Sequence, residues 1–219
     1  MKAVHILNRF GQNGVSAGII NLAREGFYDG CDIRIIALAK GEAKTYDILC
    51  ELLGPEHITF LSADDKPQLS KDFLRYTRAL RKQIQEFNPQ IAICSNSISL
   101  LIARTAALVN SELVLASFMH STKCEGAMMR TALRLTSFRD DVVLGDASIT
   151  LQEAVPLLFL TRPPKHVVPL VIPELCRPRE KRDVRSFNIL SLGRLHPEKN
   201  YTELIYAAAL LKREGYSGS

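Results

Sequence analysis

The 219-residue sequence lacks three features that would point to common protein classes. No apolar run reaches about 18 residues, which excludes a membrane-spanning helix. The five cysteines are scattered, and none is spaced as in zinc or redox motifs, so a reducing compartment is the simplest setting. No basic segment is rich in aromatic residues, and the net charge is only +5, which argues against nucleic acid as a partner.

The sequence also lacks internal repeats, low-complexity tracts and a typical signal peptide, because the strand-like run of residues 1–8 is interrupted by Arg9. We therefore expect a cytoplasmic protein. Its 47% hydrophobic and 23% charged residues permit a sizeable core. The mildly basic balance suits anionic substrates or an anionic membrane surface.

Short apolar runs alternate with helical patterns over the first 160 residues. The predicted strands are residues 3–7, 32–39, 57–61, 90–94, 112–118 and 141–144. The predicted helices are residues 19–26, 45–53, 70–87, 99–109, 126–138 and 151–155, and a glycine-spaced loop is expected over residues 11–18. This order predicts an α/β fold, with a Rossmann-like parallel sheet and helices on both faces.

Composition changes near Thr161, where prolines and charged residues become frequent. We expect residues 1–160 to form one domain, residues 161–186 to form an interdomain linker that contains a short strand at 166–172, and residues 187–219 to begin a second, incomplete Rossmann-like domain. In that last part, residues 189–192 predict a strand and residues 201–213 an amphipathic helix. One strand and one helix bury too little apolar area to fold alone.

The turn between this strand and helix carries Arg194 and Lys199. A helix N-terminus offers unpaired N–H groups, Arg adds a planar fork of donors, and Lys adds a point charge. Together they predict a site for a diphosphate. The alternative is a solvated turn with two surface cations.

Four landmarks in the sequence occur in the order found in a known family. They are the opening KAVHILN followed by FGQNGVSAG, the segment QIAICSNS at residues 90–97, the strand end SFMH at residues 117–120, and FNILSLGRLHPEK at residues 187–199. With these landmarks the chain resembles the retaining, nucleotide-sugar-dependent glycosyltransferases of family 4, which have the two-domain GT-B fold.

The resemblance implies roles for individual residues. Arg194 and Lys199 would grip the donor diphosphate, and Gly14 would let backbone approach the donor closely. His120 would face the donor sugar as a catalytic residue. Asn13 and Asn96 are candidate sugar or acceptor contacts, although many relatives have histidine where this chain has Asn96. From the residues alone, the glycine spacing also fits a plain turn. His120 also fits a histidine at a strand end whose ring hydrogen bonds are made to backbone groups.

The implied chemistry is transfer of a sugar from a nucleotide-diphosphate sugar to a polysaccharide, lipopolysaccharide or lipid-linked acceptor, with retention at the anomeric carbon. No cofactor and no metal are expected, in agreement with the lack of an Asp-x-Asp pair. Expected partners are the nucleotide sugar and a glycan or glycolipid acceptor.

Two basic helix faces predict peripheral contact with the inner membrane surface. They comprise Lys71, Arg75, Arg78 and Lys82 on one helix, and Arg130 and Arg134 on another. Ordinary solvated helix faces are the alternative interpretation.

The family's second domain normally continues well beyond this length, so we expect a truncated chain with little transferase activity alone. Two other functions stay open. One is a catalytically inactive remnant that binds a sugar, a lipid or a protein, and the other is an unrelated nucleotide-binding α/β domain.

Overall fold

A computed structural model of the chain describes residues 1–121, 126–160, 163–170, 189–191, 193, 195 and 199–216, with the side chains of residues 69–71 excepted. The chain divides into two compact units, Met1–Ile172 and Pro173–Ser219. Each unit is described by itself.

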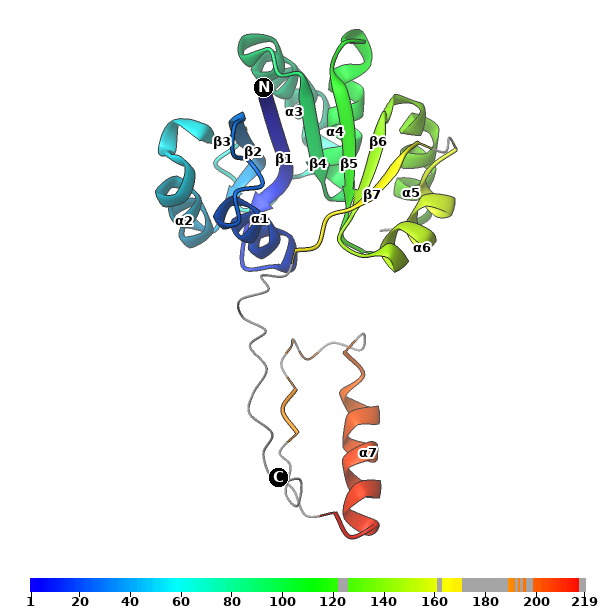
Figure 1. Ribbon diagram of the computed structural model, residues 1–219. Coiled ribbons are helices and arrows are strands. Elements are labelled where there is room, and N and C mark those ends of the chain that lie inside the picture. The colour runs from blue at the N-terminus through cyan, green and yellow to red at the C-terminus, as the bar shows by residue number, and fades with distance from the viewer. Residues whose placement is uncertain are drawn as a thin grey trace. The chain divides into compact units, whose positions relative to one another are not determined.

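The first unit is built on a parallel sheet with the strand order β3-β2-β1-β4-β5-β6-β7 (Figure 1). Every neighbouring pair of strands is parallel. The strands are β1 (Lys2–Phe10), β2 (Asp32–Gly41), β3 (Ile58–Phe60), β4 (Ile91–Ser95), β5 (Val114–Met119), β6 (Val142–Gly145) and β7 (Lys165–Val167). The predicted fold class, a Rossmann-like parallel sheet flanked by helices, is confirmed.

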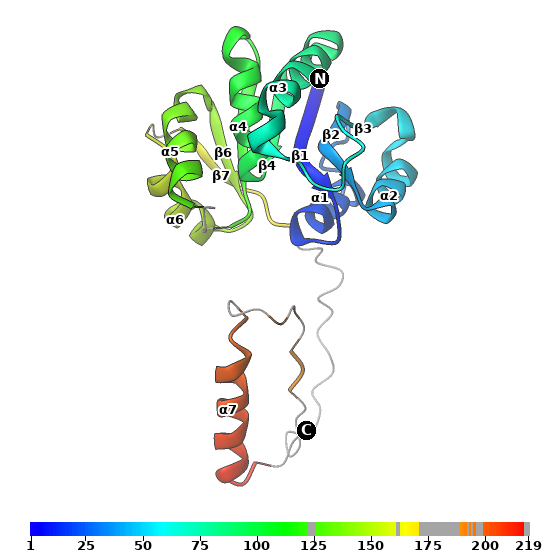
Figure 2. The ribbon, with the colours of Figure 1, turned by 180° about the vertical axis from the view of Figure 1, so that it is seen from behind.

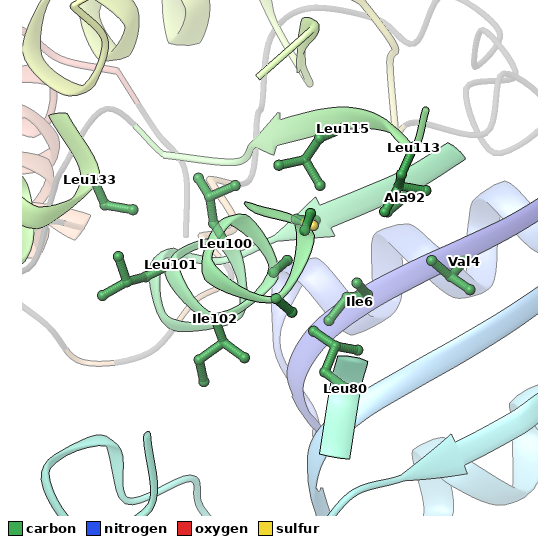
Figure 3. Packing of buried hydrophobic residues seen from close by; sticks show 14 of the residues in the cluster. Val4, Ile6, Leu80, Ala92, Leu100, Leu101, Ile102, Leu113, Leu115 and Leu133 are labelled. Carbon is green, nitrogen blue, oxygen red and sulfur yellow. The ribbon is translucent and has the colours of Figure 1, made fainter. Parts of the chain in front are cut away.

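Helices cover both faces of this sheet (Figures 1 and 2). They are α1 (Gly14–Arg24), α2 (Ala43–Leu53), α3 (Leu69–Phe87), α4 (Ser97–Ala106), α5 (Gly126–Thr136) and α6 (Ser148–Leu158). One buried cluster joins α3, α4, α5 and α6 to the sheet, and part of it is drawn in Figure 3. A second cluster joins α1 and α2 to the opposite face.

The central strands are apolar on both faces because both faces are covered. In β1, Val4 and Ile6 belong to the first cluster, whereas Ala3 and Leu7 belong to the second. The alternation follows from the two-residue period of a strand. It explains why these strands appear in the sequence as continuous apolar runs.

The expected glycine loop over residues 11–18 is wrong in its second half, because α1 already begins at Gly14. Asn13 caps this helix: its side-chain oxygen accepts a hydrogen bond from the Ser16 N–H at 3.0 Å. The helix then buries Ile19 and Leu22 against the sheet. The favourable cap and this burial outweigh the low helix propensity of Gly14.

The expected linker also begins later than residue 161. Strand β7 pairs with β6, with Val143 opposite Lys165, and is therefore the seventh strand of the first unit. After it, the Asn21 side-chain amide donates to the Leu170 carbonyl at 3.1 Å. The described residues 163–170 thus belong to the first unit, which extends to Ile172.

In the second unit, α7 (Tyr201–Arg213) has the bounds that the sequence predicted. The strand expected over residues 189–192 is not formed in the described residues 189–191. Ile189 and Leu190 are largely exposed, and α7 has no buried residue. A single strand gains no ladder hydrogen bonds, so a strand pattern without a neighbouring strand stays irregular.

Candidate functional site

A pocket of about 320 Å³ lies at the carboxyl ends of β1, β4 and β5. The chain passes from β1 to β2 on one side and returns to β4 on the other, so β1 and β4 flank a topological switch point. Ligands of open α/β sheets bind in the crevice at such a point. The pocket is lined by Asn8, Val15, Asn96, Ser97, Leu100, Phe118, Met119, His120, Ser121, Leu133 and Leu158.

Asn96 connects β4 to α4 with a strained backbone, at φ 86° and ψ 150°. This region is adopted almost only by glycine and costs on the order of 1–3 kcal/mol for other residues. Strain of this size persists where the surroundings enforce it, and it concentrates at binding sites.

Asn8 is one of the residues that hold Asn96. The Asn8 N–H donates to the Asn96 side-chain oxygen at 3.4 Å, and the Asn8 side-chain oxygen accepts from the Ser99 N–H at 2.8 Å. Asn8 on β1 therefore caps α4 from the neighbouring strand, and Asn96 makes no side-chain cap of its own. Asn8 was not among the predicted site residues; its only signal in the sequence is a polar residue near the end of an apolar strand.

His120 lines the pocket at the end of β5 with a side chain that is 10% exposed. Its Nε2 is 2.9 Å from the Ser95 hydroxyl, and its ring lies 4.3 Å from that of Phe118. Its Nδ1 is buried and has no hydrogen-bond partner in the described part of the chain; it lies 4.0 Å from an Asp146 oxygen. Burial lowers the pKa of His120 to about 4 against the opposing effect of Asp146, so the imidazole is neutral at pH 7.

Behind His120 lie three buried polar side chains that were not predicted as site residues: His5, Ser95 and Tyr28. The His5 imidazole is within hydrogen-bond distance of both the Ser95 and the Tyr28 hydroxyls. Burial, and to a lesser degree His120, lowers the pKa of His5 to about 3. A histidine inside an apolar strand was the available sequence signal.

The structure brings two of the predicted site residues, Asn96 and His120, into one pocket. Asn13 and Gly14 are exposed at the start of α1, and the next residue, Val15, lines the pocket. A Cβ added to Gly14 would meet no atom within 4 Å, so packing within the first unit does not require glycine there.

The predicted diphosphate cations belong to the second unit. Arg194 lies outside the described residues. Lys199 is exposed and directly precedes Asn200, the N-cap of α7, which makes no side-chain cap hydrogen bond.

The basic face of α3 is partly paired with acidic side chains. Arg75 lies 3.2 Å from Asp72 and 3.4 Å from Asp64, and Lys82 lies 3.7 Å from Glu86. Arg78 is exposed, and the Lys71 side chain is not among the described ones.

The basic face of α5 differs from that of α3. Arg130 and Arg134 have no ion pair within the described ranges, and Arg130 is exposed. Exposed Met128 and Leu135 lie on the same helix, and exposed Phe138 follows it.

The described residues offer neither a metal-binding cluster nor a membrane-spanning helix. They contain no group of three or more His, Cys, Asp or Glu side chains placed to hold a metal ion. None of the described helices combines the length and the apolar character that crossing a membrane demands.

A second hollow, of about 480 Å³, opens at the amino ends of the strands beside Met1, Lys2, Asp32, Asn88 and Gln90. It is larger than the pocket at the carboxyl ends, but it is shallow and open. Because α/β sheets bind ligands at the carboxyl ends of their strands, we take the smaller pocket as the site.

Comparison with known proteins gives similarity in structure only. No family model and no curated protein sequence matches the chain. Among solved structures it resembles HepE of Anabaena in complex with UDP and glucose, with a TM-score of 0.58, 12% identity and coverage of 78% of this chain and 45% of that one. It also resembles the lipopolysaccharide outer core galactosyltransferase WaaB in its apo form, with a TM-score of 0.53, 16% identity and coverage of 74% and 45%.

A third similar structure is the UDP-GlcNAc 2-epimerase of Neisseria meningitidis bound to UDP-GlcNAc, with a TM-score of 0.53, 12% identity and coverage of 71% and 43%. These likenesses support the GT-B fold. This chain spans less than half the length of each of the three.

Proposed function

We propose that this chain is part of a nucleotide-sugar-dependent glycosyltransferase whose sugar-binding site is the pocket beside Asn96 and His120. The observation that carries the proposal is the buried Nδ1 of His120, which has no hydrogen-bond partner among the described residues and lies in a pocket at the topological switch point. An unpaired buried polar atom is costly unless a ligand or water completes its hydrogen bonding. The structures of HepE with UDP and glucose and of the epimerase with UDP-GlcNAc support this ligand class.

In the proposed reaction, the bond between the anomeric carbon and the donor diphosphate breaks, and its electron pair stays on the phosphate oxygen. An acceptor hydroxyl oxygen bonds to the anomeric carbon and passes its proton to an oxygen of the leaving diphosphate, with retention as in family 4. Arg194 and Lys199 are proposed to stabilise the negative charge of the leaving diphosphate. Cations aimed at that charge lower the barrier because the charge grows in the transition state.

The start of α1 is proposed as the place of closest approach to the donor. Gly14 is exposed, and a side chain there would point into open space, so glycine is kept free for a ligand rather than for packing. The N-terminus of α1 adds backbone N–H groups and a positive dipole end. The Asn13 side-chain oxygen already accepts the cap hydrogen bond from the Ser16 N–H, which leaves the side-chain NH₂ group for a sugar hydroxyl.

His120 is proposed to hydrogen-bond the donor sugar as a neutral imidazole, and Asn96 to contact the sugar or acceptor through its amide. The acceptor is proposed to be a polysaccharide, lipopolysaccharide or lipid-linked glycan. WaaB, a lipopolysaccharide galactosyltransferase of similar fold, supports this class.

Peripheral membrane contact is proposed for α5 in preference to α3. Helix α5 combines two cations without ion pairs in the described residues with exposed Met128 and Leu135, which suits the boundary of an anionic bilayer. On α3, carboxylates neutralise Arg75 and Lys82 in part. The α3 face is therefore better explained as a solvated surface.

Two other functions compete with this proposal. The epimerase is as similar in structure as WaaB, so epimerisation of a nucleotide sugar is the second enzymatic candidate. A catalytically inactive module that binds sugar, lipid or protein is the non-enzymatic one. Because the matched part of this chain covers only 45% of HepE and of WaaB, we expect the present chain to bind donor weakly and to transfer little sugar alone.

Calorimetric titration of the full chain with UDP, UDP-glucose and UDP-GlcNAc tests the proposal. We expect weak binding that falls in Arg194→Ala and in Lys199→Ala but not in Lys212→Ala, a control at the other end of α7. Absence of binding to every nucleotide and nucleotide sugar would contradict it. Incubation of UDP-GlcNAc with the chain, followed by chromatography of the sugar, separates epimerisation from transfer.

A further inference from the structure

Four side chains from distant parts of the sequence form a continuous hydrogen-bonded row that ends at the pocket. Tyr28 Oη lies 2.7 Å from His5 Nδ1, His5 Nε2 lies 2.8 Å from Ser95 Oγ, and Ser95 Oγ lies 2.9 Å from His120 Nε2. His5 and Ser95 are fully buried, and Tyr28 is 6% exposed. We call Tyr28, His5 and Ser95 the relay.

The protons in this row can be counted. Burial raises the pKa of Tyr28 and lowers the pKa values of His5 and His120 to about 3 and about 4, so all four groups are neutral at pH 7. Each neutral side chain then carries one polar hydrogen. Four hydrogens serve three hydrogen bonds, so one hydrogen is left over.

Two directions of the row place the spare hydrogen at opposite ends. In a third arrangement Ser95 accepts from both imidazoles, but its own buried O–H then lacks an acceptor, because His5 and His120 are its only partners in the described residues. If every group donates toward the pocket, the spare hydrogen lies on His120 Nδ1. If every group donates away from it, the spare hydrogen lies on Tyr28, for which the described residues offer no partner besides His5.

Both ends of the row favour donation toward the pocket. In that direction the Tyr28 O–H has an acceptor in His5, and the His120 Nδ1–H faces an Asp146 carboxylate oxygen at 4.0 Å. In the opposite direction a buried hydroxyl lacks its acceptor, and a lone pair on Nδ1 faces the carboxylate. A buried donor without an acceptor costs about 1–3 kcal/mol, which is enough to select one direction.

We propose that Tyr28, His5 and Ser95 are positioning residues that hold His120 in its Nδ1–H tautomer. His120 then acts on a ligand as a neutral N–H donor toward an oxygen acceptor, such as a hydroxyl or phosphate oxygen, and not as a base. Only this ligand step rests on the proposed function. The tautomer of His120 is a property of the chain without ligand. A wrong tautomer would therefore leave the proposed function standing, and a failure to bind donor would leave the tautomer proposal standing.

Nitrogen-15 NMR of the ring nitrogens of histidine tests the proposal on the full chain at pH 7 without ligand. The chain has five histidines, and the variants His5→Gln and His120→Gln assign two of the signal sets by their disappearance. We expect opposite tautomers: Nε2–H for His5 and Nδ1–H for His120. A His120 that carries its hydrogen on Nε2 would overturn the proposal.

Two variants test whether the relay is the cause. Ser95→Ala removes the donor to His120 Nε2, so the share of Nε2–H tautomer at His120 should rise. Ser16→Ala is the matched control, because Ser16 is also buried and its hydroxyl has no hydrogen-bond partner in the described residues.

Tyr28→Phe removes the first donor of the row and changes the packing less than Ser95→Ala does. It therefore provides the test if the Ser95→Ala protein does not fold. We expect it to give mixed tautomers at His5 and His120, whereas Tyr76→Phe, at a buried tyrosine outside the row, leaves both unchanged. An unchanged His120 tautomer in every folded relay variant would show that the row is only structural.

Discussion

The backbone at Asn96 provides a prediction that separates strain from side-chain chemistry. Asn96→Gly and Asn96→Ala both remove the side chain and its hydrogen bond with the Asn8 N–H. In the folded state the two variants therefore differ only in how well they tolerate φ 86° and ψ 150°. Alanine bears strain of order 1–3 kcal/mol there, whereas glycine adopts this conformation freely.

Glycine also raises the entropy of the unfolded chain, which costs about 0.4–1 kcal/mol relative to alanine. The difference leaves Asn96→Gly more stable than Asn96→Ala by about 1–2 kcal/mol. In a unit of this size, 1 kcal/mol corresponds to about 2–4 °C in Tm. Thermal unfolding followed by circular dichroism, with urea unfolding as a second measure, resolves a difference of this size.

Asn110 supplies the control, since it caps the short helix at Ala107–Val109 with an ordinary φ of −123°. At this position the order should reverse, with Asn110→Gly less stable than Asn110→Ala by about 0.5–1 kcal/mol. An Asn96→Ala protein as stable as Asn96→Gly would refute the assignment of strain. If the amide contacts the ligand, both variants at Asn96 should lose donor binding equally.

Four further predictions concern stability and membrane binding. Arg104→Met should destabilise the first unit by about 3–5 kcal/mol in urea unfolding, because Arg104 is fully buried in an ion pair with Asp140. The pKa values of the two buried site histidines lie below the unfolded value of 6.5, so the unfolded state gains protons below pH 6.5. The free energy of unfolding should then fall by up to about 2.7 kcal/mol per pH unit from pH 6.5 toward pH 4, and His120→Gln should halve this slope between pH 7 and pH 5. Gly18→Ala should be nearly neutral, because its Cβ would lie 2.6 Å from a Leu170 methyl carbon and this contact offsets the gain of about 0.5–1 kcal/mol that alanine brings inside a helix. Arg130→Ala should weaken sedimentation with phosphatidylserine vesicles by about five-fold; equal binding of variant and parent chains would remove α5 as the membrane face.

Most of the first unit could be predicted from sequence because its strands are buried on both faces and appear as apolar runs between helical patterns. Two errors arose from tertiary contacts. The short strand expected at residues 166–172 forms at Lys165–Val167, but its exposed residues did not indicate that it pairs with β6 as part of the first unit rather than the linker. Gly14 and Gly18 suggested a loop, but the Asn13 cap and the burial of Ile19 fix a helix.

The site could be predicted only where a motif or a strand end marks it. Asn96 and His120 lie at strand ends, and the order of strands brings them together. The partners that orient them, Asn8 and Ser95, were missed because their roles depend on contacts between residues about 90 and 25 positions apart in the chain. No local pattern encodes such contacts.

The central claim is that the pocket at the carboxyl ends of β1, β4 and β5 binds a nucleotide sugar. The most direct test is an NMR titration of the labelled full chain with UDP-glucose and UDP-GlcNAc, in which backbone and histidine signals are followed. The account predicts the largest shifts at Val15, Asn96 and His120. Shifts confined to Met1, Asp32 and Gln90, at the opposite edge of the sheet, or no shifts with either ligand, would contradict it.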